Sequence, residues 1–312
     1  MSTTNTSAIL CVDIGGTSTK AGVLCEATTL EFVQSIPSAP PVDSYAHGLV
    51  KMMEDICHAA QQQGYGLRQA GIAVAGFLDR QREFIVYNPN LAWLESYPLK
   101  RQLQAHFEQL EFELEIDSNA ATMAEYRFGS GQGSRRFLCV TSGTGLGVGM
   151  TVEGVPLRFA YGCMGDIGHT IVLRDGPLCT CGGKGCAEIM VSAPAVAARY
   201  RTAAGLVEEV TLRDVILEAQ SGNAKAASVL RDAGEWLGVA IASMANTFFP
   251  DHIAIAGGLS AAGDFVLDPA QRVFRETACV LARENVTFAR AELGPMATLI
   301  GAAWPFFAEG VV

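Results

Sequence analysis

The sequence predicts an α/β protein built of two domains that share a cleft, and three observations support this. A chain of 312 residues is long enough for two domains, each with its own hydrophobic core. Short apolar runs that end in glycine turns alternate with segments of helical spacing. One strand–turn–strand pattern occurs twice, at residues 9–24 and 137–152, as expected of a duplicated domain that clamps a nucleotide.

The composition excludes several classes of protein. Apolar residues make up 49% of the chain and charged residues 17%, which is typical of a soluble globular protein. The net charge of −10 and the lack of a basic stripe argue against a nucleic-acid surface. No basic signal segment precedes the first apolar run, and no run reaches the ~18 residues of a membrane span. Scattered cysteines are typical of a reducing compartment, so we expect a cytoplasmic protein with no nucleic-acid or membrane partner.

The first hairpin, residues 9–24, has a glycine turn suited to a phosphate. Backbone N–H groups at such a turn can bind phosphate oxygens, and hydroxyl and ammonium groups can add to them. The residues expected to do so are Gly15, Gly16, Thr17 and Lys20. Asp13, at the end of the preceding strand, can hold Mg²⁺ through water. Taken alone, the segment could equally be a plain hairpin.

The second hairpin, residues 137–152, repeats the design 128 positions after the first (137 minus 9). Its turn contains Gly143, Thr144 and Gly145, and no dinucleotide-binding helix follows it. A third strand, beginning at Ile253, ends in Gly257 and Gly258, where bare backbone can approach an adenine or ribose. The pairing of the two hairpins favours a nucleotide site more than either hairpin does.

Between the two hairpins, residues 45–63 have helical spacing, and residues 70–75 form a buried strand that stops at Gly76. The loop 86–93 is rich in amide side chains, including Asn90, and ends in a tryptophan. Amides and an aromatic face suit a sugar, but by itself such a loop is more often an ordinary surface turn.

The segment 112–125 reads as a strand that ends at Ile116 and a helix that follows directly. Asp117 stands at the junction. A carboxylate at a strand end is well placed for general-base catalysis, and the same residue type also caps helix N-termini. The sequence favours neither interpretation over the other.

One histidine and three cysteines occur within eighteen positions, with glycines between the last two cysteines. They are His169, Cys179, Cys181 and Cys186. Four such ligands satisfy tetrahedral zinc and leave no open position, so the pattern predicts a structural Zn²⁺ that holds a loop. The alternative is ordinary buried thiols beside a histidine. Farther along, helical spacing predicts helices over residues 193–201, 212–219, 224–248, 265–283 and 296–307.

The chain resembles the ROK family of bacterial sugar kinases and sugar-responsive repressors over nearly its full length. The motifs that carry the resemblance are D-I-G-G-T from Asp13, S-G-T-G-L-G-V-G from Ser142, G-D-I-G-H from Gly165, C-x-C-G-G-x-G-C-x-E from Cys179 and I-A-G-G from Ile255. The cysteine block with its preceding histidine is the most specific of them. The chain is similar to the kinase members, which lack the DNA-binding domain that many of the repressors carry.

The resemblance implies an actin-like, hexokinase-like (ribonuclease H-like) pair of α/β lobes with the active-site cleft between them. It implies an N-terminal lobe of residues 1–117, completed by residues 296–312, and a larger lobe of residues 118–295 with the zinc loop. It also implies ATP, Mg²⁺ and structural Zn²⁺ as cofactors, a sugar as substrate, and a homodimer. Asp117 is then the catalytic base, and the sugar contacts are Gly76, Asn90, Asp117, Asp166, His169 and Glu188.

Two residues depart from the family pattern. The family has Asn before the base, where this chain has Ile116, and Glu in the E-x-G-H motif, where this chain has Asp166. The resemblance predicts an ATP-dependent kinase for a hexose or N-acetylhexosamine that phosphorylates a hydroxyl, the primary 6-hydroxyl by analogy. A sensor that binds sugar without catalysis is the alternative, and a polyphosphate-dependent kinase is a third, weaker one. The sequence does not name the sugar.

Overall fold

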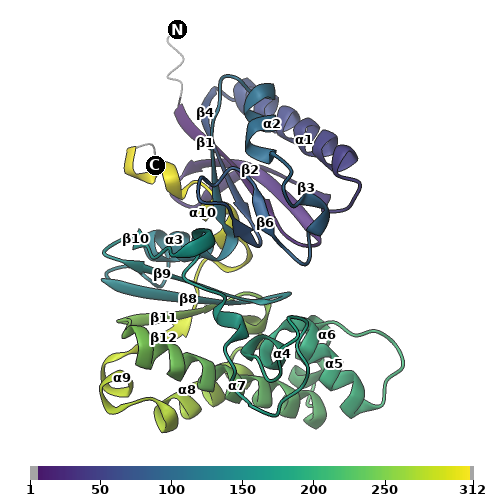
Figure 1. Cartoon of the computed structure of the whole chain (residues 1–312), viewed down its shortest axis with the longest axis vertical. Helices are drawn as coiled ribbons and strands as arrows, with labels where there is room; N and C mark the ends of the chain where they lie inside the picture. The colour runs from purple at the N-terminus through teal and green to yellow at the C-terminus, as the bar shows by residue number, and fades with distance from the viewer. Residues whose placement is uncertain (1–5, 310–312) are drawn as a thin grey trace. The chain divides into compact units, whose positions relative to one another are not determined.

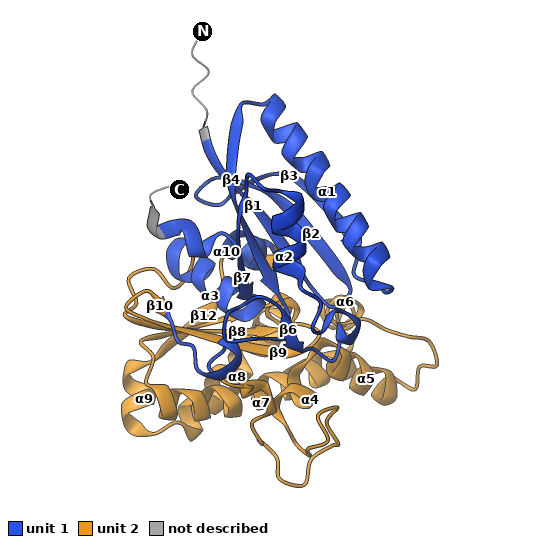
Figure 2. Cartoon of the chain, turned by 45° about the horizontal axis from the view of Figure 1, so that its top comes forward, with its two compact units in different colours: residues 1–128, 156–164, 296–312 blue, residues 129–155, 165–295 orange. Residues whose placement is uncertain are grey.

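The computed structural model describes residues 6–309 and divides into two compact units, coloured separately in Figure 2. Unit 1 contains residues 1–128, 156–164 and 296–312, and unit 2 contains residues 129–155 and 165–295. The sequence predicts domain boundaries at residue 117 and around residue 295. This division into folding domains remains a prediction. Among the described residues, no helix is both long enough and apolar enough to span a membrane.

Unit 1 is built on a five-stranded mixed sheet in the order β3-β2-β1-β4-β7. Its strands are β1 (Thr6–Ile14), β2 (Ser18–Glu26), β3 (Thr29–Pro37), β4 (Tyr65–Val74) and β7 (Glu111–Ile116). β1 pairs antiparallel with β2 and parallel with β4 (Figure 1). The hairpin predicted over residues 9–24 is therefore the centre of this sheet.

Helices pack on both faces of this sheet. They are α1 (Val42–Gln62), α2 (Leu99–His106), α3 (Asp117–Phe128) and α10 (Ala297–Gly301). Leu10 and Val12 of β1 point into the core beneath α1 and α2, while α10 packs against α3 and the sheet from the other side. A Cβ at Gly71 would lie 1.8 Å from the Ala302 carbonyl oxygen, so only glycine lets the C-terminal segment lie this close to β4.

Unit 2 repeats this arrangement in a sheet of order β10-β9-β8-β11-β12. Its strands are β8 (Arg136–Ser142), β9 (Leu146–Val152), β10 (Val155–Pro156), β11 (His252–Ala256) and β12 (Thr287–Arg290). β8 pairs antiparallel with β9 and parallel with β11, as β1 does with β2 and β4. The equivalent pairing bears out the duplication that the two hairpins predict.

Helices α4 to α9 lie on one side of the unit 2 sheet (Figure 1). They are α4 (Ala187–Val191), α5 (Ala193–Ala204), α6 (Leu212–Gln220), α7 (Ala224–Phe248), α8 (Asp264–Thr277) and α9 (Val280–Asn285). α7 is buried along one face and contacts α4, α5, α6 and α8. The end of β8 is tied to this layer, because the Ser142 hydroxyl donates to the Val191 carbonyl of α4 at 2.9 Å.

Two helices expected to be continuous are interrupted. Residues 265–283 form α8 and α9, because Ala278 and Cys279 are extended and the Cys279 N–H donates to Asn246 Oδ1 at 2.9 Å. Residues 296–307 form α10 and a separate 3₁₀ turn, Trp304–Glu309, which contains Pro305, a residue without a backbone N–H for a continuing helix.

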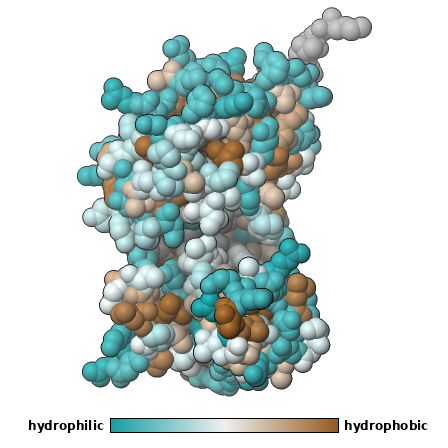
Figure 3. All heavy atoms as spheres, turned by 90° about the vertical axis from the view of Figure 1, so that its right-hand side faces the viewer, coloured by the Kyte–Doolittle hydropathy of each residue, from teal (hydrophilic) through white to brown (hydrophobic). Residues whose placement is uncertain are grey.

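Short elements complete both units. In unit 1 they are β5 (Phe77–Leu78), β6 (Ile85–Tyr87) and the 3₁₀ turns Ala92–Leu94 and Ala160–Gly162. In unit 2 they are the 3₁₀ turns Ile167–His169 and Gly258–Ala262, and a last 3₁₀ turn, Gly294–Met296, begins in unit 2 and ends on the first residue of the C-terminal segment of unit 1. Hydrophobic side chains on the face drawn in Figure 3 gather in separate patches within a mostly hydrophilic surface.

Candidate functional site

The glycine turn between β1 and β2 is closed by a hydrogen bond from the Gly15 N–H to the Ser18 carbonyl, 3.1 Å long. A Cβ at Gly16 would lie 3.0 Å from Asn90 Cβ, so the turn and the loop that carries Asn90 are in contact. Asp13 pairs in register with Lys20 across the hairpin. Unit 1 thus brings the predicted phosphate turn and one predicted sugar residue together.

The loop that carries Asn90 is organised by Asn88, a buried residue that the sequence reading did not single out. The Asn88 amide donates to the Ala75 carbonyl at 2.7 Å, and its Oδ1 accepts the Asn90 N–H at 2.8 Å. Gly76 has φ +101°, and a Cβ there would lie 2.8 Å from Asn88 Cβ. These bonds close the loop on itself and tie it to the residue that follows β4. An Asn followed by further turn residues is the sequence signal for such a side-chain-closed turn.

Asp117 is the first residue of α3 and directly follows β7. Its Oδ1 accepts the Ser118 N–H at 2.6 Å, whereas a helix cap bonds to the second or third N–H of the helix. Burial, and secondarily the charge of Asp13, raise the pKa of Asp117 to about 7. A carboxylate with a pKa near the working pH is suited to accept a proton in catalysis. The geometry therefore fits a base better than a cap.

Asp13 has a raised pKa as well, to about 6, because burial outweighs the attraction of Lys20. The two carboxylates of unit 1 thus oppose each other electrostatically, which favours a cation beside them. By contrast, Ile116 is 3% exposed and belongs to the unit 1 core. Ile116 stands where the family has Asn. A sugar hydroxyl could contact the Ile116 side chain only by reaching into that core.

In unit 2, the turn between β8 and β9 is closed by the Gly143 N–H, which donates to the Gly145 carbonyl at 2.9 Å. A Cβ at Gly257 would lie 2.3 Å from the Ser142 carbonyl oxygen. The Gly257–Gly258 turn therefore packs directly on the base of this hairpin. Two of the three predicted nucleotide turns meet within one unit.

Beside these turns lies a cavity of about 340 Å³. Its lining comes from the hairpin turn, from α5 and from the segment that leads into α6: Thr144, Ala193, Pro194, Ala197, Ala198, Arg201, Glu209, Val210, Thr211 and Leu212. Arg201 and Glu209 form an ion pair at 2.5 Å. The lining is largely apolar with a few polar groups, which suits a flat aromatic base. Sequence reasoning missed this cavity, because small alanines on a helix carry no local signal.

The carboxylate of Glu188 also lies against the second hairpin. Its Oε2 accepts the Leu146 N–H at 3.0 Å and would be 2.6 Å from a Cβ at Gly145. Its Oε1 lies 4.0 Å from His169 Nε2, and Asp166 Oδ2 lies 3.6 Å from the same nitrogen. The three residues expected to contact the sugar in this unit are thus neighbours.

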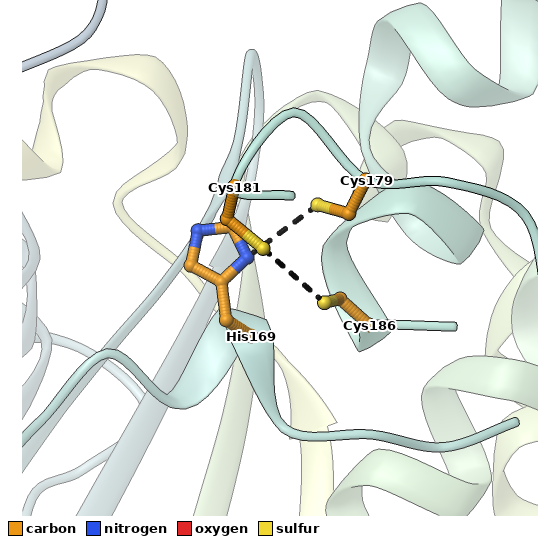
Figure 4. A group of neighbouring side chains, drawn as sticks. All are labelled: His169, Cys179, Cys181 and Cys186. Atoms are coloured by element: carbon orange, nitrogen blue, oxygen red, sulfur yellow. Dashed lines mark hydrogen bonds between the residues drawn. The ribbon is translucent and has the colours of Figure 1, made fainter. Parts of the chain in front are cut away.

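The four predicted metal ligands converge (Figure 4), with their ligand atoms within 4.8 Å of one another. His169 Nδ1 lies 3.5 Å from Cys179 Sγ, and Cys181 Sγ lies 3.6 Å from Cys186 Sγ. Tetrahedral zinc with Zn–S bonds of ~2.3 Å and Zn–N bonds of ~2.0 Å separates its ligand atoms by about 3.5–3.8 Å. The residues therefore fit a zinc ion, with His169 Nδ1 nearest the cluster and Nε2 nearest the two carboxylates.

The loop around this cluster is tightly folded. Backbone bridges pair Ile171 with Cys186 and Leu178 with Lys184. Gly185 has φ +68°, and a Cβ there would lie 1.6 Å from the Leu173 carbonyl oxygen. The glycines between the cysteines thus permit the close approach that the sequence pattern predicts.

Two copies of one sheet topology, each with a glycine-turn hairpin at its centre, define an α/β protein of the duplicated, actin-like class. The ROK family model matches residues 9–308, and the chain belongs to the ROK family. Glucokinase of Streptomyces coelicolor is 31% identical, with 94% of this chain and 95% of that protein covered. Glucokinase of Halalkalibacterium halodurans is 32% identical, with 94% and 93% covered.

A solved structure supports the same assignment. The ROK family glucokinase from Streptomyces griseus, in complex with glucose and AMPPNP, superposes with a TM-score of 0.82 at 31% identity and covers 96% of this chain and 98% of its own. The predicted fold class, an α/β protein of two actin-like lobes, is confirmed.

Proposed function

We propose that this protein is an ATP-dependent sugar kinase that transfers the γ-phosphate to a hydroxyl of a hexose or N-acetylhexosamine, at the primary 6-hydroxyl. The observation that carries the proposal is Asp117, a carboxylate at the end of β7 whose pKa is raised to about 7. The similarity to a glucokinase structure that holds glucose and a nucleotide analogue supports a sugar as acceptor and a nucleotide as phosphoryl donor.

In this reaction Asp117 accepts the proton of the sugar hydroxyl while the hydroxyl oxygen bonds to the γ-phosphorus. The bond from that phosphorus to the bridging oxygen of ADP breaks, and ADP leaves with its electrons. Phosphoryl transfer depends mainly on positioning and charge neutralisation, so one well-placed base is enough on the protein side. Protonated Asp117 cannot act, and the rate should therefore rise with pH.

The phosphate contacts proposed in unit 1 are the backbone N–H groups of the Gly15–Thr17 turn and the Lys20 ammonium, and those proposed in unit 2 are the backbone N–H groups of the Gly143–Gly145 turn. Asp13 would hold Mg²⁺, for which the mutual repulsion of the two unit 1 carboxylates is a fitting environment. When bound, Mg²⁺ neutralises the phosphate charge that develops during transfer.

The adenosine would occupy the cavity beside the Gly257–Gly258 turn. Ala193, Ala197 and Ala198 would provide flat apolar walls. This cavity supports a nucleotide as phosphoryl donor. A polyphosphate donor has no base and would leave it without a role.

The sugar contacts proposed in unit 1 are Asn90 and the Gly76 backbone, and those proposed in unit 2 are Asp166, His169 and Glu188. Zn²⁺, held by His169 and the three cysteines, would act structurally, because four protein ligands leave no position for water or substrate. Its effect on catalysis would be indirect, through the loop that carries the sugar ligands. The expected homodimer and cytoplasmic location remain predictions.

The decisive experiment measures ADP release by a coupled assay across hexoses and N-acetylhexosamines, with C2, C3 and C4 epimers included. We expect sugar-dependent ADP release well above basal ATP hydrolysis for at least one sugar. A protein that binds a sugar in calorimetry, yet releases no ADP with any of them, would instead be a sensor. Activity with polyphosphate and none with ATP would point to the other donor.

A further inference from the structure

Glu115 is a fully buried carboxylate two residues before Asp117, at 0% exposure. Taking a carboxylate out of water costs several kcal/mol unless it is paired and hydrogen-bonded. Its Oε2 accepts from the Arg158 guanidinium and, at 3.3 Å, from the Trp304 indole N–H. Buried ion pairs seldom add net stability over apolar packing, so a pair retained here calls for another role.

The second oxygen of Glu115 bonds to one residue before Asp117 and to one residue after it. Oε1 accepts the Ile116 N–H at 3.0 Å and the Asn119 side-chain amide at 2.9 Å. Ile116 precedes Asp117, and Asn119 lies two residues after it. One carboxylate oxygen therefore bonds to the backbone of the residue before the proposed base and to the side chain of a residue two positions after it.

Asn119 extends this network to a second segment. Its amide also donates to the Gly162 carbonyl at 2.8 Å. Both of these partners are acceptors, so the amide nitrogen must face them, and the buried Oδ1 is left without a partner among the described residues. The orientation of Asn119, and with it the first turn of α3, is thus set by Glu115 and Gly162 together.

The second segment, residues 156–164, is here called the strap. It belongs to unit 1, although the chain on both sides of it belongs to unit 2. Arg158 and Gly162 tie the strap to Glu115 and Asn119, and Tyr161 packs edge-on against Phe77 with ring centroids 6.4 Å apart. Tyr161 and Gly162 both adopt left-handed backbone, at φ 60° and 79°, which only surrounding contacts can hold for a tyrosine.

We propose that Glu115 is a positioning residue for the phosphoryl transfer proposed above. Its carboxylate fixes the direction of Asp117 by bonding the residues around it, and through Arg158 it holds the strap. The strap continues within two residues into Asp166, and then His169, of the proposed sugar site. The inference rests on the proposed function, since it concerns the geometry of the same base.

The test is Glu115→Gln. All the partners of Glu115 described above are N–H donors, and a glutamine carries an NH₂ donor of its own. Either orientation of its amide therefore places a donor against a donor. We expect kcat to fall ~10- to 100-fold, the range that a small misplacement of a reacting group can cost. The KM for ATP should stay within about two-fold, because the turns that hold the nucleotide do not involve Glu115.

The matched control is Glu113→Gln. Glu113 lies on the same strand, and it pairs with Arg82 at 3.3 Å and with Lys100 at 3.4 Å without bonding to the strap. Arg82 also lies 3.6 Å from Glu115 Oε2, so this control leaves Glu115 with both of its arginine partners. Its kcat should stay within about two-fold of wild type. Arg158→Met, which removes the other half of the buried pair, should lower kcat as Glu115→Gln does. The double variant should lose less than the product of the two single losses, because both act through one contact.

The outcomes separate the hypotheses. A kcat for Glu115→Gln within two-fold of wild type, in protein that melts well above the assay temperature, overturns the positioning role. If that variant does not fold, Arg158→Met decides, and near-normal turnover there overturns the role equally. An equal loss in Glu113→Gln would show a general effect of the strand and would also overturn it. A wild-type protein that is inactive with every sugar would instead defeat the proposed function, and the positioning role with it.

Discussion

At the scale of single residues, Asp117 carries the proposed chemistry, and its surroundings would let a carboxylate there act near neutral pH. It lies at the end of a buried strand, with Asp13 close enough to raise its pKa further. A helix-capping role would need neither feature. Two consequences of the raised pKa can be measured separately.

The first concerns activity. Asp117→Asn keeps the shape of the side chain and removes the base, so we expect turnover to fall by at least the ~10²- to 10⁴-fold that a general base contributes. In the wild type, kcat/KM should rise with pH and level off above a midpoint near the pKa of about 7. A steady-state pH series tests this. A flat profile between pH 5.5 and 8.5, or near-normal turnover of the variant, would exclude Asp117 as the base.

The second concerns stability. The folded-state pKa of Asp117, about 7, lies above the ordinary value of 3.8, so folding favours the protonated form. Its contribution is fully present below pH 3.8 and is lost as pH rises through 7. Asp117→Asn is always neutral and escapes this loss. Its Tm relative to wild type should therefore increase between pH 5.5 and 8.5 without magnesium or nucleotide, and a constant difference would contradict the assigned pKa.

At the scale of elements, the cavity proposed to hold the nucleotide depends on small residues of α5. Ala198 is exposed and lines the cavity, so Ala198→Phe should fill it with a ring. We expect the KM for ATP to rise ~10-fold or more, while sugar affinity by calorimetry stays near wild type. Ala203→Phe, an exposed position of the same helix outside the cavity lining, is the control. An unchanged KM for ATP in Ala198→Phe would place the base elsewhere.

The zinc loop is the second element with a clear test. Protein purified without a metal-binding tag should contain about one zinc per chain. Cys181→Ala should weaken sugar binding and lower the Tm, with no rescue by magnesium, because the loop carries Asp166, His169 and Glu188. Cys279→Ala, an exposed cysteine outside the cluster, should leave both unchanged. Zinc far below one per chain in protein never exposed to a chelator would disprove the metal site.

At the scale of the whole molecule, ligand binding should stabilise the folded chain. A ligand at 100 times its Kd adds about 2.7 kcal/mol to the free energy of unfolding. We expect both the substrate sugar and a non-hydrolysable ATP analogue to raise the Tm, and Asp117→Asn to retain both shifts. Differential scanning calorimetry measures them. A shift with sugar and none with nucleotide would favour the sensor over the kinase.

Several features could be predicted from the sequence because their physical cause is local. Glycine-rich turns between apolar strands, the spacing of a histidine and three cysteines, and an aspartate between a strand and a helix all depend on neighbours along the chain. The structure contains each of these features: the hairpins at residues 9–24 and 137–152, the convergence of the cysteines, and the strand–helix junction at Asp117. The breaks at Ala278 and before Pro305 were missed because helical periodicity continues across both.

Tertiary structure alone decided which distant residues meet. Glu115 reaches Arg158 and Trp304 because the chain returns twice to unit 1, and no local pattern encodes that return. The cavity wall of α5 is likewise made of alanines whose role appears only once the α6 segment lies opposite. The sequence by itself determined the duplicated α/β fold, the glycine turns and the clustering of one histidine with three cysteines, since these depend on backbone freedom and on chemical groups close along the chain. The pKa of Asp117, the burial of Ile116 and the partners of Glu115 depend on burial and on charges brought together by packing, and only the folded molecule sets those.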